Sequence, residues 1–329
     1  NYTSADDRQA ISQLLGPAVW QKLEALRARR VTGRSARLLM RFFGEILIHR
    51  RNPFLFQELV DSGARRRRFF DNIEKDLGIV DRNANDEATV LEVLAECRAV
   101  LARYREEVEG APEQRRRLSR ELGAIVGKDN VLFDPFTLVS HATDATDWRL
   151  HLPVAVVMPD DEAQVAPALA AIARLGLKAL PRGAGTGLTG GAVPLRQGCV
   201  VVNTEKLNRI RGTSTCTFGL AGGREAEAKV LELEAGVITE RAMEHAAEHG
   251  YVFATDPTSA WACTIGGNVA ENAGGKDCVL YGTCIDNLVS WRMAMPSGRS
   301  WTIRRTDHQL RKILPEDTVT FEVADEDGT

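Results

Sequence analysis

Apolar residues recur at helical spacing through the first part of the chain. One stripe places adjacent apolar pairs every four positions: Leu38, Leu39, Phe42, Phe43, Ile46 and Leu47. A second stripe, which begins at a capping-box sequence at 89–92, alternates steps of four and three: Val90, Leu94, Cys97, Leu101, Tyr104 and Val108. Both patterns are typical of helices with one buried face. Because Gly110-Ala-Pro112 interrupts the second stripe, we expect a helical domain over residues 1–115 that ends in a linker.

The pattern changes at residue 118 to short apolar runs that alternate with helical stretches. Residues 118–126 predict a short helix, and Pro153–Met158 is a continuous apolar run of the kind that forms a buried strand. A helical stretch follows, and further strands are predicted at 178–180 and 200–203. This order is a β-α-β unit followed by a loop and another strand.

The next part of the chain is more polar. Residues 211–229 contain several glycines and predict a surface loop, whereas Val230–Ala235 alternate like a half-buried strand. Residues 239–249 predict a helix on which His245 and His249 lie one turn apart, the spacing of a metal-binding pair. No Glu follows His245 in the order His-Glu-x-x-His and no third ligand is evident, so we expect surface histidines and no metal site.

Composition narrows the class of protein. The chain has 329 residues, 44% hydrophobic and 26% charged, which predicts a globular protein of two domains. The net charge of −3 divides unevenly: residues 1–117 carry 22 basic and 18 acidic side chains (+4), and residues 118–329 carry 20 and 27 (−7). The run Arg65–Arg68, followed by two phenylalanines, could bind nucleic acid, but interleaved acidic residues favour a solvated or protein-docking helix face, so no nucleic-acid partner is expected.

The cysteines and the hydropathy indicate in which cellular compartment the protein is expected. Six cysteines form no Cys-x-x-Cys pair and no zinc-site spacing with histidine, which favours buried, reduced thiols of a cytoplasmic protein. No apolar run has the length of a membrane span, and the N-terminal residues of the chain, which begins at Asn1, lack a signal-peptide pattern. We therefore expect a cytoplasmic protein without a transmembrane segment, with peripheral membrane association as the alternative.

Pro181–Gly191 is the most unusual stretch. Its eleven residues contain five glycines and two threonines, and consecutive backbone N–H groups in such a loop can converge on an anion such as pyrophosphate. The string Gly185-x-Gly187-x-x-Gly190 also matches the Rossmann fingerprint, which requires a helix directly after the glycines. Because Cys199–Val202 already predicts the next strand, no room remains for that helix. The alternative to a phosphate-binding loop is a flexible loop without a ligand.

Asp256–Gly275 is the second unusual stretch. It contains two Gly-Gly pairs and two asparagines, Asn268 and Asn272, among small residues. Because each glycine costs backbone entropy in regular structure, this composition suits a backbone that lies against a large planar ligand, with the asparagines as polar anchors. A tight crossing of two chain segments would explain one Gly-Gly pair, but hardly both.

Pro181–Pro194, Asp256–Gly275 and Tyr281-Gly282 together resemble the PCMH-type FAD-binding domain of the vanillyl-alcohol-oxidase superfamily. Within it they most resemble D-lactate dehydrogenases, glycolate oxidase D-subunits and D-2-hydroxyglutarate dehydrogenases. The resemblance covers about residues 118–300. It implies an α+β fold in which an all-α domain (1–115) precedes an FAD-binding domain (116–329) of two α/β subdomains, at 118–212 and 213–329.

The resemblance also implies where FAD binds. Gly183–Gly191 would hold the pyrophosphate, and the later segments would run along the ribityl chain and the isoalloxazine. Thr186 takes the position at which covalently flavinylated members carry histidine, which implies non-covalent FAD. The implied cofactor-binding residues are Arg182, Gly183, Ala184, Gly185, Thr186, Gly187, Leu188, Thr189, Gly190, Gly191, Pro257, Thr258, Ser259, Thr264, Ile265, Gly266, Gly267, Asn268, Asn272, Ala273, Gly274 and Tyr281.

The activity implied is FAD-dependent dehydrogenation of a D-2-hydroxy acid, such as D-lactate, glycolate or D-2-hydroxyglutarate. Hydride would pass to flavin N5 and electrons to a quinone, cytochrome or flavoprotein rather than to NAD. The alternatives are a non-redox flavin enzyme of the alkyl-glycerone-phosphate synthase type and an FAD-binding or interaction subunit of a larger electron-transfer complex.

The resemblance is incomplete at its C-terminal side. The chain stops at Thr329, before the family's later Gly-rich segment and its substrate-binding cap, so we expect a truncated FAD-binding domain. The catalytic base and the carboxylate clamp normally come from that cap, and their identity stays unknown. The helical N-terminal part is similar to an extra domain of some large bacterial flavoproteins, whose C-terminal iron–sulfur motifs would belong to the missing part.

Overall fold

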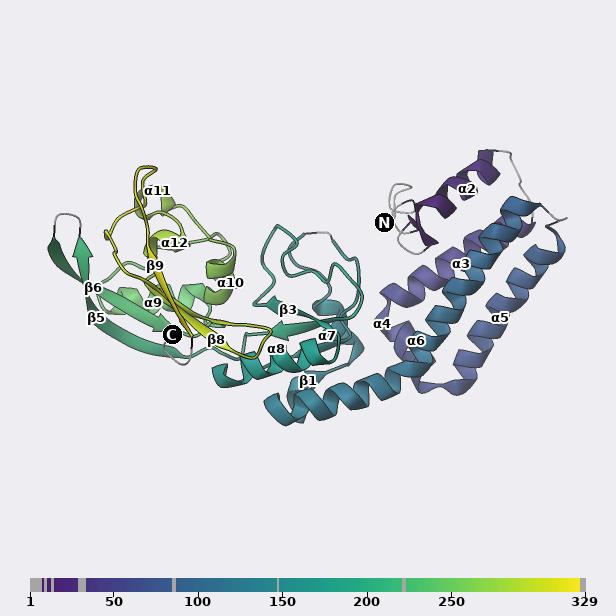
Figure 1. Cartoon of the computed structure of the whole chain (residues 1–329), viewed down its shortest axis with the longest axis horizontal. Helices are drawn as coiled ribbons and strands as arrows, with labels where there is room; N and C mark the ends of the chain where they lie inside the picture. Colours follow the sequence, from purple (N-terminus) through teal and green to yellow (C-terminus); the bar gives the residue numbers. More distant parts are fainter. Residues whose placement is uncertain are drawn as a thin grey trace. The chain divides into compact units, whose positions relative to one another are not determined.

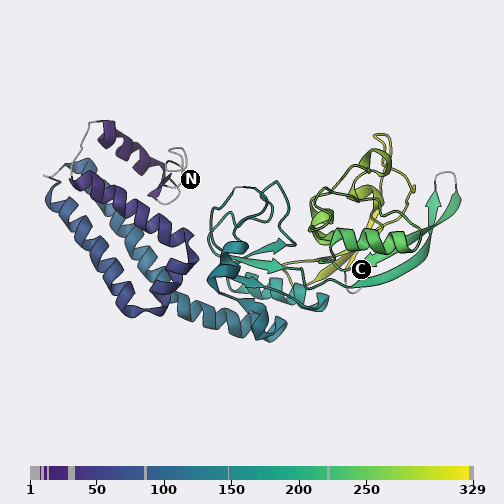
Figure 2. The same cartoon turned by 180° about the vertical axis from the view of Figure 1, so that it is seen from behind.

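A computed structural model of the chain describes residues 8, 11–12, 15–28, 34–84, 87–146, 148–220 and 223–325 (Figures 1 and 2). The chain divides into two compact units, residues 1–116 and residues 117–329. Each unit has its own buried core, as domains of this size do. Among the helices in the described ranges, none combines the length and the apolar character that crossing a membrane requires.

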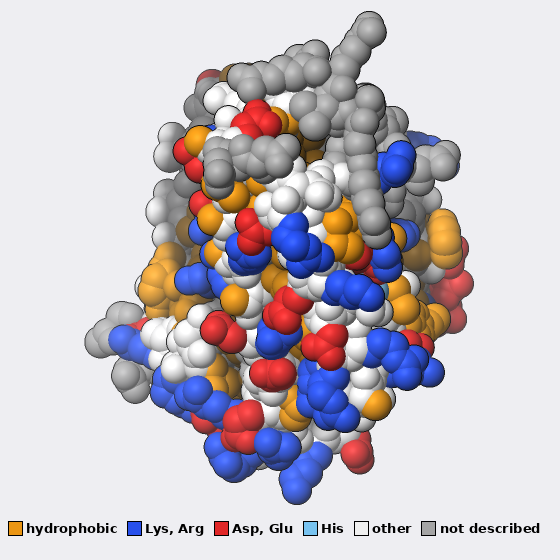
Figure 3. Space-filling view, turned by 90° about the vertical axis from the view of Figure 1, so that its right-hand side faces the viewer, with side chains coloured by type: hydrophobic (Ala, Val, Ile, Leu, Met, Phe, Trp, Pro, Cys, Tyr) orange, Lys and Arg blue, Asp and Glu red, His pale blue; other side chains and the backbone are white. Residues whose placement is uncertain are grey.

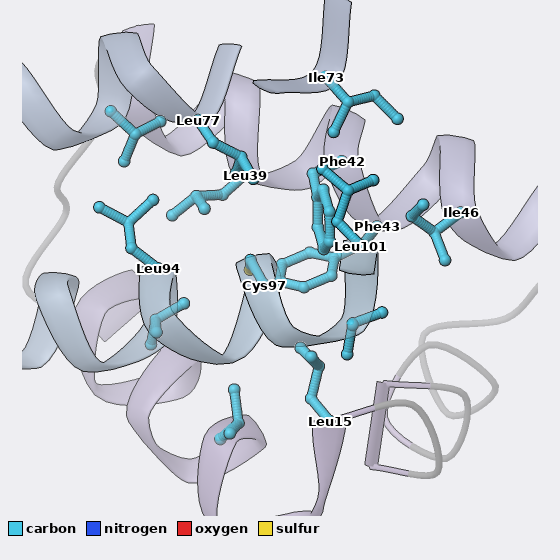
Figure 4. Packing of buried hydrophobic residues seen from close by; sticks show 14 of the residues in the cluster. Leu15, Leu39, Phe42, Phe43, Ile46, Ile73, Leu77, Leu94, Cys97 and Leu101 are labelled. Atoms are coloured by element: carbon cyan, nitrogen blue, oxygen red, sulfur yellow. The ribbon is translucent and has the colours of Figure 1, made fainter. Parts of the chain in front are cut away.

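Unit 1 is helical, as the apolar stripes predict. Its helices are α2 (Pro17–Ala28), α3 (Arg34–Arg51), α4 (Pro53–Asp61), α5 (Gly63–Arg82) and α6 (Ala88–Val126). Asn52 and Ser62 accept backbone N–H groups at the starts of α4 and α5, which satisfies donors that a helix start leaves free. Figure 4 shows side chains from α3, α5 and α6 packed together in the core of this unit.

Both predicted stripes are confirmed as buried faces. Leu39, Phe42, Phe43 and Ile46 of α3 lie in the core, Leu38 and Leu47 of the same stripe are half-buried, and all six members of the α6 stripe are buried. The arginine-rich start of α5 is largely exposed, and Arg65 there pairs with Glu58. Further along α5, Glu74 pairs with Arg105 of α6 at 2.9 Å. Figure 3 shows acidic and basic side chains interleaved on the face that it presents.

The predicted break at Gly110-Ala-Pro112 is wrong. α6 runs without interruption from Ala88 to Val126, through Pro112, so no linker follows residue 110 and residues 118–126 are not a separate helix. Thr89 lies inside the first turn of α6, so it does not cap the helix. Proline removes one helical N–H, but strong helix formers flank it, and Val108, Ala111 and Leu118 are buried on either side. Packing therefore outweighs the proline.

The first half of unit 2 is a four-stranded sheet of order β1-β2-β4-β3. Its strands are β1 (Val131–Leu132), β2 (Ala155–Val157), β3 (Lys178–Arg182) and β4 (Cys199–Asn203). β4 pairs in parallel with both β2 and β3, and the central strands are buried on both faces, as parallel strands require. One face packs on α8 (Val165–Arg174) and the end of α6; the other packs on α7 (Pro135–Ser140).

The second half of unit 2 begins with a hairpin. β5 (Ile210–Leu220) and β6 (Arg224–Leu233) are antiparallel, so the predicted loop over 211–229 is wrong. Thr213, Thr215 and Thr217 are β-branched residues at period two that pair with β6, and this alternation was the missed strand signal.

Short helices and a small sheet complete unit 2. The helices are α9 (Thr239–Glu248), α10 (Ile265–Ala270), α11 (Cys278–Tyr281) and α12 (Cys284–Asn287). The sheet, of order β7-β8-β9, contains β7 (Ser290–Ala294), β8 (Ser300–Arg305) and β9 (Phe321–Asp325). The predicted helix at 239–249 is therefore observed as α9, and Gly250 follows it with φ +79°. All of these elements are antiparallel or local, which agrees with an α+β chain.

All six cysteines are free thiols. Cys97, Cys199 and Cys263 are buried as expected, whereas Cys216, Cys278 and Cys284 are half-buried. Burial raises the pKa of the Cys97 thiol to about 12, with Glu96 adding to the shift. A thiol with that pKa is unreactive near neutral pH, since the thiolate is the nucleophile.

Candidate functional site

The glycine loop connects β3 to its parallel neighbour β4. Residues 183–198 contain neither helix nor strand, which excludes the Rossmann arrangement for this loop, since that arrangement needs a helix at its start. Gly185 and Gly190 have φ angles of +70° and +78°, where an L side chain is strained. The loop therefore takes a path that its glycines make possible.

Arg182, at the end of β3, anchors the loop. Its guanidinium donates to the backbone oxygens of Thr143 at 2.7 Å and Ala192 at 3.1 Å, and more weakly to that of Ser140 at 3.4 Å. Burial lowers the pKa of Arg182, although nearby carboxylates oppose this shift. A Cβ on Gly185 would lie 2.1 Å from Nη2 of this guanidinium. Arg182 thus joins the far end of the loop to the segment that follows α7, and only glycine fits above it.

The second glycine-rich segment folds back on itself. A Cβ on Gly275 would lie 2.0 Å from Oδ1 of Asp256, so the two ends of the segment meet. The backbone oxygens of Pro257 and Ser259 accept N–H groups within a turn that leads into α10. The sequence predicted no regular structure here, and the six-residue helix α10 corrects that prediction. The helix needs a glycine at Gly266, because a Cβ at this position would lie only 2.8 Å from the Ala235 Cβ.

The two asparagines hold this segment in place. Asn268 is buried and donates from Nδ2 to Oγ1 of Thr239 at 2.6 Å. Asn272 has a φ of +50°, and its Oδ1 accepts the N–H of Ile285 at 2.9 Å. These two side-chain atoms are therefore engaged within the fold.

The two glycine-rich segments meet in unit 2. A Cβ on Gly183 would stand 2.1 Å from Oγ1 of Thr264, and one on Gly191 would stand 2.4 Å from Oε1 of Glu271. Thr189 donates from Oγ1 to Oε2 of the same glutamate at 3.0 Å. Residues separated by about 80 positions are thus in contact.

One polar atom has no hydrogen-bond partner at the place where the two glycine-rich segments meet. Thr264 is buried, and its Oγ1 makes no hydrogen bond in the structure. A buried hydroxyl without a partner costs free energy, so this position favours a ligand that supplies one. In contrast, a Cβ on Gly187 would meet nothing within 4 Å, so the middle of the loop is open to a second molecule. These features fit a large cofactor with an anionic and hydrogen-bonding chain.

The remaining residues that the resemblance implies lie in the two glycine-rich segments and in α11. Ala184 and Thr186 lie in the loop, while Leu188 projects with 76% of its surface exposed. Thr258 lies in the turn before α10, and Ala273 donates its N–H to the Asn268 oxygen at 2.8 Å. Tyr281 ends α11 and its backbone oxygen accepts from Asn287 at 2.9 Å. Ile265, Gly267 and Gly274 belong to α10 and the turn after Asn272.

Sequence reasoning missed several polar groups beside the loop. Glu271 was the one acidic residue between the two asparagines, and its charge was the available signal. Asp144 is buried with Oδ2 unpartnered, while its Oδ1 accepts from Thr146. Burial lowers the pKa of His141, whose Nδ1 lies 2.8 Å from the Thr137 oxygen. Because a carbonyl only accepts, that Nδ1 carries hydrogen, and Nε2 lies 2.9 Å from Nδ2 of Asn203.

Comparisons with known proteins agree with this geometry. Residues 153–304 match the family described as "FAD binding domain", and residues 1–106 match a family described as "Protein of unknown function (DUF3683)". The chain thus contains a PCMH-type FAD-binding domain that follows a helical region of the second family. The matched FAD segment includes both glycine-rich stretches.

Two relatives illustrate the similarity. Glycolate oxidase subunit GlcD of Escherichia coli strain K12 is 37% identical over 151 residues, which are 46% of this chain and 28% of that protein. D-lactate dehydrogenase of Anaerostipes hadrus is 35% identical over 118 residues, 36% of this chain and 22% of the relative. The chain therefore spans less than a third of the length of either relative. A solved structure of alkyldihydroxyacetonephosphate synthase has a TM-score of 0.47 at 19% identity, covering 57% of this chain and 38% of that one.

Proposed function

We propose that this chain supplies the FAD-binding part of an FAD-dependent dehydrogenase of D-2-hydroxy acids. The observation that carries the proposal is the approach of Thr264 to Gly183: a buried hydroxyl without a partner faces a backbone position that admits no side chain. The family match of residues 153–304 supports FAD as the ligand. The similarity to a glycolate oxidase subunit and a D-lactate dehydrogenase supports a small 2-hydroxy acid as the substrate.

The proposed roles follow from the geometry. Gly183–Gly191 would bind the pyrophosphate through backbone N–H groups, because the net charge of −7 over residues 118–329 opposes anions at longer range. Pro257–Ser259, Thr264–Asn268 and Asn272–Gly274 would line the ribityl chain and the ring system, with Tyr281 beside them. When bound, FAD would supply hydride acceptance at N5. Arg182 positions the loop rather than touching the cofactor, since its donors are engaged with backbone oxygens.

The wider proposal concerns the domains and the reaction. We assign residues 116–329 to the FAD-binding domain, with subdomains at 118–212 and 213–329, after a helical domain at 1–115. D-lactate, glycolate and D-2-hydroxyglutarate are the candidate substrates, and a quinone, a cytochrome or another flavoprotein is the candidate electron acceptor. Oxidation of the hydroxy acid needs a base near the hydroxyl and a cation for the carboxylate, and we assign neither to this chain.

Two measurements test FAD binding. The purified chain should show a flavin absorption spectrum or bind added FAD at one molecule per chain. Because Thr186 replaces the histidine of covalently flavinylated proteins, acid precipitation should leave yellow FAD in the supernatant. A flavin that stays with the pellet would contradict the non-covalent mode. A chain that binds no FAD at micromolar concentration would overturn the proposal.

The reaction is tested on the full-length gene product loaded with FAD. Anaerobic mixing with D-lactate, glycolate or D-2-hydroxyglutarate should bleach the oxidised flavin, and L-lactate is the stereochemical control. Bleaching by none of these three 2-hydroxy acids, with FAD still bound, would contradict the substrate class but leave the FAD proposal intact.

A second role is compatible with the first. We propose that the protein acts as one subunit of a larger electron-transfer assembly, because the relative from Escherichia coli is itself named as a subunit. The helical region at 1–106 would then be available for docking. Size-exclusion chromatography with light scattering on the natively expressed protein should give a mass above that of the chain, with a stoichiometric second polypeptide. A free chain of monomer mass would contradict this role.

A further inference from the structure

Three metal-binding side chains gather at the C-terminal end of α9. His245, Glu248 and His249 each offer one ligand atom, and these atoms all lie within 4.8 Å of one another. The sequence order His-x-x-Glu-His places the three residues at positions i, i+3 and i+4, which share one face of a helix. The search for a glutamate directly after His245 missed Glu248, which comes directly before His249 instead. The structure thus adds Glu248 as a third candidate ligand beside the two histidines.

His249 is already oriented for coordination. Its Nδ1 lies 2.8 Å from the backbone oxygen of His245. Because a carbonyl oxygen only accepts, Nδ1 carries the hydrogen, and the lone pair is on Nε2. Metal-bound histidines commonly donate their second ring nitrogen to a carbonyl in this way, which fixes the tautomer and the ring orientation. His249 is exposed, so Nε2 is accessible to a cation from solvent.

His245 lies beside His249 and against the hairpin. The two imidazole rings have centroids 4.5 Å apart at an interplanar angle of 35°. Nε2 of His245 is 3.4 Å from Oγ1 of Thr213 on β5, a long contact that sets the side of α9 on which the ring lies. His245 is half-buried, which limits its rotamers more than those of its two partners. The three groups thus combine one restrained ligand with two that can adjust.

The local field favours a cation. The site lies at the last turn of α9, where the backbone carbonyl ends of the helix carry partial negative charge. Glu248 adds a full negative charge, and residues 118–329 are acidic overall at −7. Two imidazoles and one carboxylate are the donors that Zn²⁺ and its neighbours in the first transition row prefer, whereas Mg²⁺ and Ca²⁺ prefer oxygen ligands throughout.

We propose that His245, Glu248 and His249 form a binding site for a divalent transition-metal cation, with Zn²⁺ as the best fit. Zinc bonds of about 2.0–2.2 Å to nitrogen and oxygen would draw the three ligand atoms to roughly 3.3 Å apart in a tetrahedron. Rotation of the exposed Glu248 side chain and small shifts of the two rings would close that difference, and a water would complete the fourth position. The bound cation would clamp the last turn of α9 beside β5.

The test is a titration of the untagged chain after treatment with a chelator. Calorimetry with Zn²⁺ should show one cation per chain, and Co²⁺ should give the visible absorption bands of a tetrahedral nitrogen–oxygen site in difference spectra. His245→Ala and His249→Ala should each weaken Zn²⁺ binding by at least about tenfold, since even indirect disturbance of a metal ligand has effects of that size. Glu248→Gln should weaken it as well, because a neutral amide is a poorer ligand.

Glu240→Gln is the matched control, because it removes an exposed acid from the first turn of the same helix. It should leave Zn²⁺ affinity unchanged. None of the three proposed ligands is in the buried core, so circular dichroism should show that the variants fold.

Three outcomes would overturn the proposal. One is no stoichiometric Zn²⁺ binding by the wild-type chain. Another is equal affinity in the doubly substituted His245→Ala/His249→Ala chain. The third is a thiolate-to-cobalt charge-transfer band, which would place the metal on the cysteines. None of these measurements depends on whether FAD is bound.

Discussion

Thr189 and Glu271 are 82 positions apart in the chain and are joined by a hydrogen bond of 3.0 Å from Oγ1 to Oε2. The other oxygen of the same carboxylate lies against Gly191, 2.4 Å from where a Cβ would stand. Glu271 therefore reaches from the second glycine-rich segment onto the first. A negative charge at this place opposes an anionic group bound in the loop.

Glu271→Gln is expected to strengthen FAD binding, because it removes this charge and keeps an acceptor for Thr189. An exposed charge contributes up to about 1 kcal/mol, so the dissociation constant should fall about two- to fivefold. Fluorescence titration with FAD at low salt measures it, and the difference should shrink as salt screens the charge. Glu244→Gln, an exposed change on α9, is the control. Weaker binding by Glu271→Gln would show instead that the carboxylate holds the cofactor.

Gly187→Val is expected to abolish FAD binding and leave the fold intact. A Cβ on Gly187 meets no atom within 4 Å in the structure, so the valine is tolerated until a ligand approaches the backbone. Flavin content of the purified variant and its urea unfolding curve are the two measurements. Gly110→Val, also at a glycine with open space around it, is the control for both. FAD at wild-type stoichiometry in Gly187→Val would exclude a pyrophosphate role for the loop.

Arg182→Ala is expected to destabilise unit 2 by about 1–3 kcal/mol, because it removes a buried side chain and leaves the partly buried carbonyls of Thr143 and Ala192 without this donor. Arg182→Lys should lose less stability than Arg182→Ala, because the lysine ammonium keeps the charge. It should still be less stable than the wild type, because it lacks the planar fork of arginine. Urea unfolding followed by circular dichroism measures both variants. Arg196→Ala removes an exposed arginine from the same connection and is the control. Unchanged stability with loss of FAD would make Arg182 a cofactor residue.

His308 predicts how the stability of unit 2 depends on pH. Burial, together with Arg305, lowers the pKa of His308 from 6.5 to about 4, although Asp286 opposes the shift. Its Nδ1 accepts the N–H of Leu310 at 3.0 Å, a bond that needs the neutral ring. The unfolded chain therefore binds more protons than the folded chain between these two values, and stability falls as pH drops from 6.5 toward 4.

The decrease in the free energy of unfolding that we assign to His308 should be on the order of 1–3 kcal/mol between these two pH values. His308→Asn keeps an acceptor for Leu310 but does not titrate, so its unfolding free energy should change less with pH. Urea midpoints at about pH 7, 5.5 and 4 compare the two proteins. Parallel pH profiles for the wild type and the variant would contradict the assignment.

Local periodicity was enough to predict several elements. The stripes of α3 and α6 are buried because a helix brings positions three and four apart to one face, whatever else the chain does. The apolar runs of β2 and β4 are also buried, as their sequences predict. A strand whose sheet is covered by helices on both faces has no face toward solvent. Glycine spacing likewise identified the two segments that meet at Thr189 and Glu271, but not the contact itself.

The errors came from places where packing opposes a local signal. Pro112 should end a helix, yet α6 continues because residues on both sides of it are buried. Residues 211–220 are polar enough for a loop, yet they pair along their length with β6. Gly266 and Gly267 disfavour a helix, yet α10 forms where Gly266 lies close to Ala235. Each outcome depends on a partner that no local window contains.

The sequence by itself determined the helical N-terminal region, the buried strands, the two glycine-rich segments and, through them, the class of FAD-binding domain. Only the tertiary structure decided that Arg182 is engaged with backbone oxygens, that Glu271 reaches the glycine loop, and that Thr264 keeps a buried hydroxyl without a partner. The physical reason is the distance along the chain over which each kind of interaction acts. Hydrophobic period and backbone freedom act over a few neighbouring residues, whereas hydrogen-bond partners and close approaches are chosen among residues far apart in the chain.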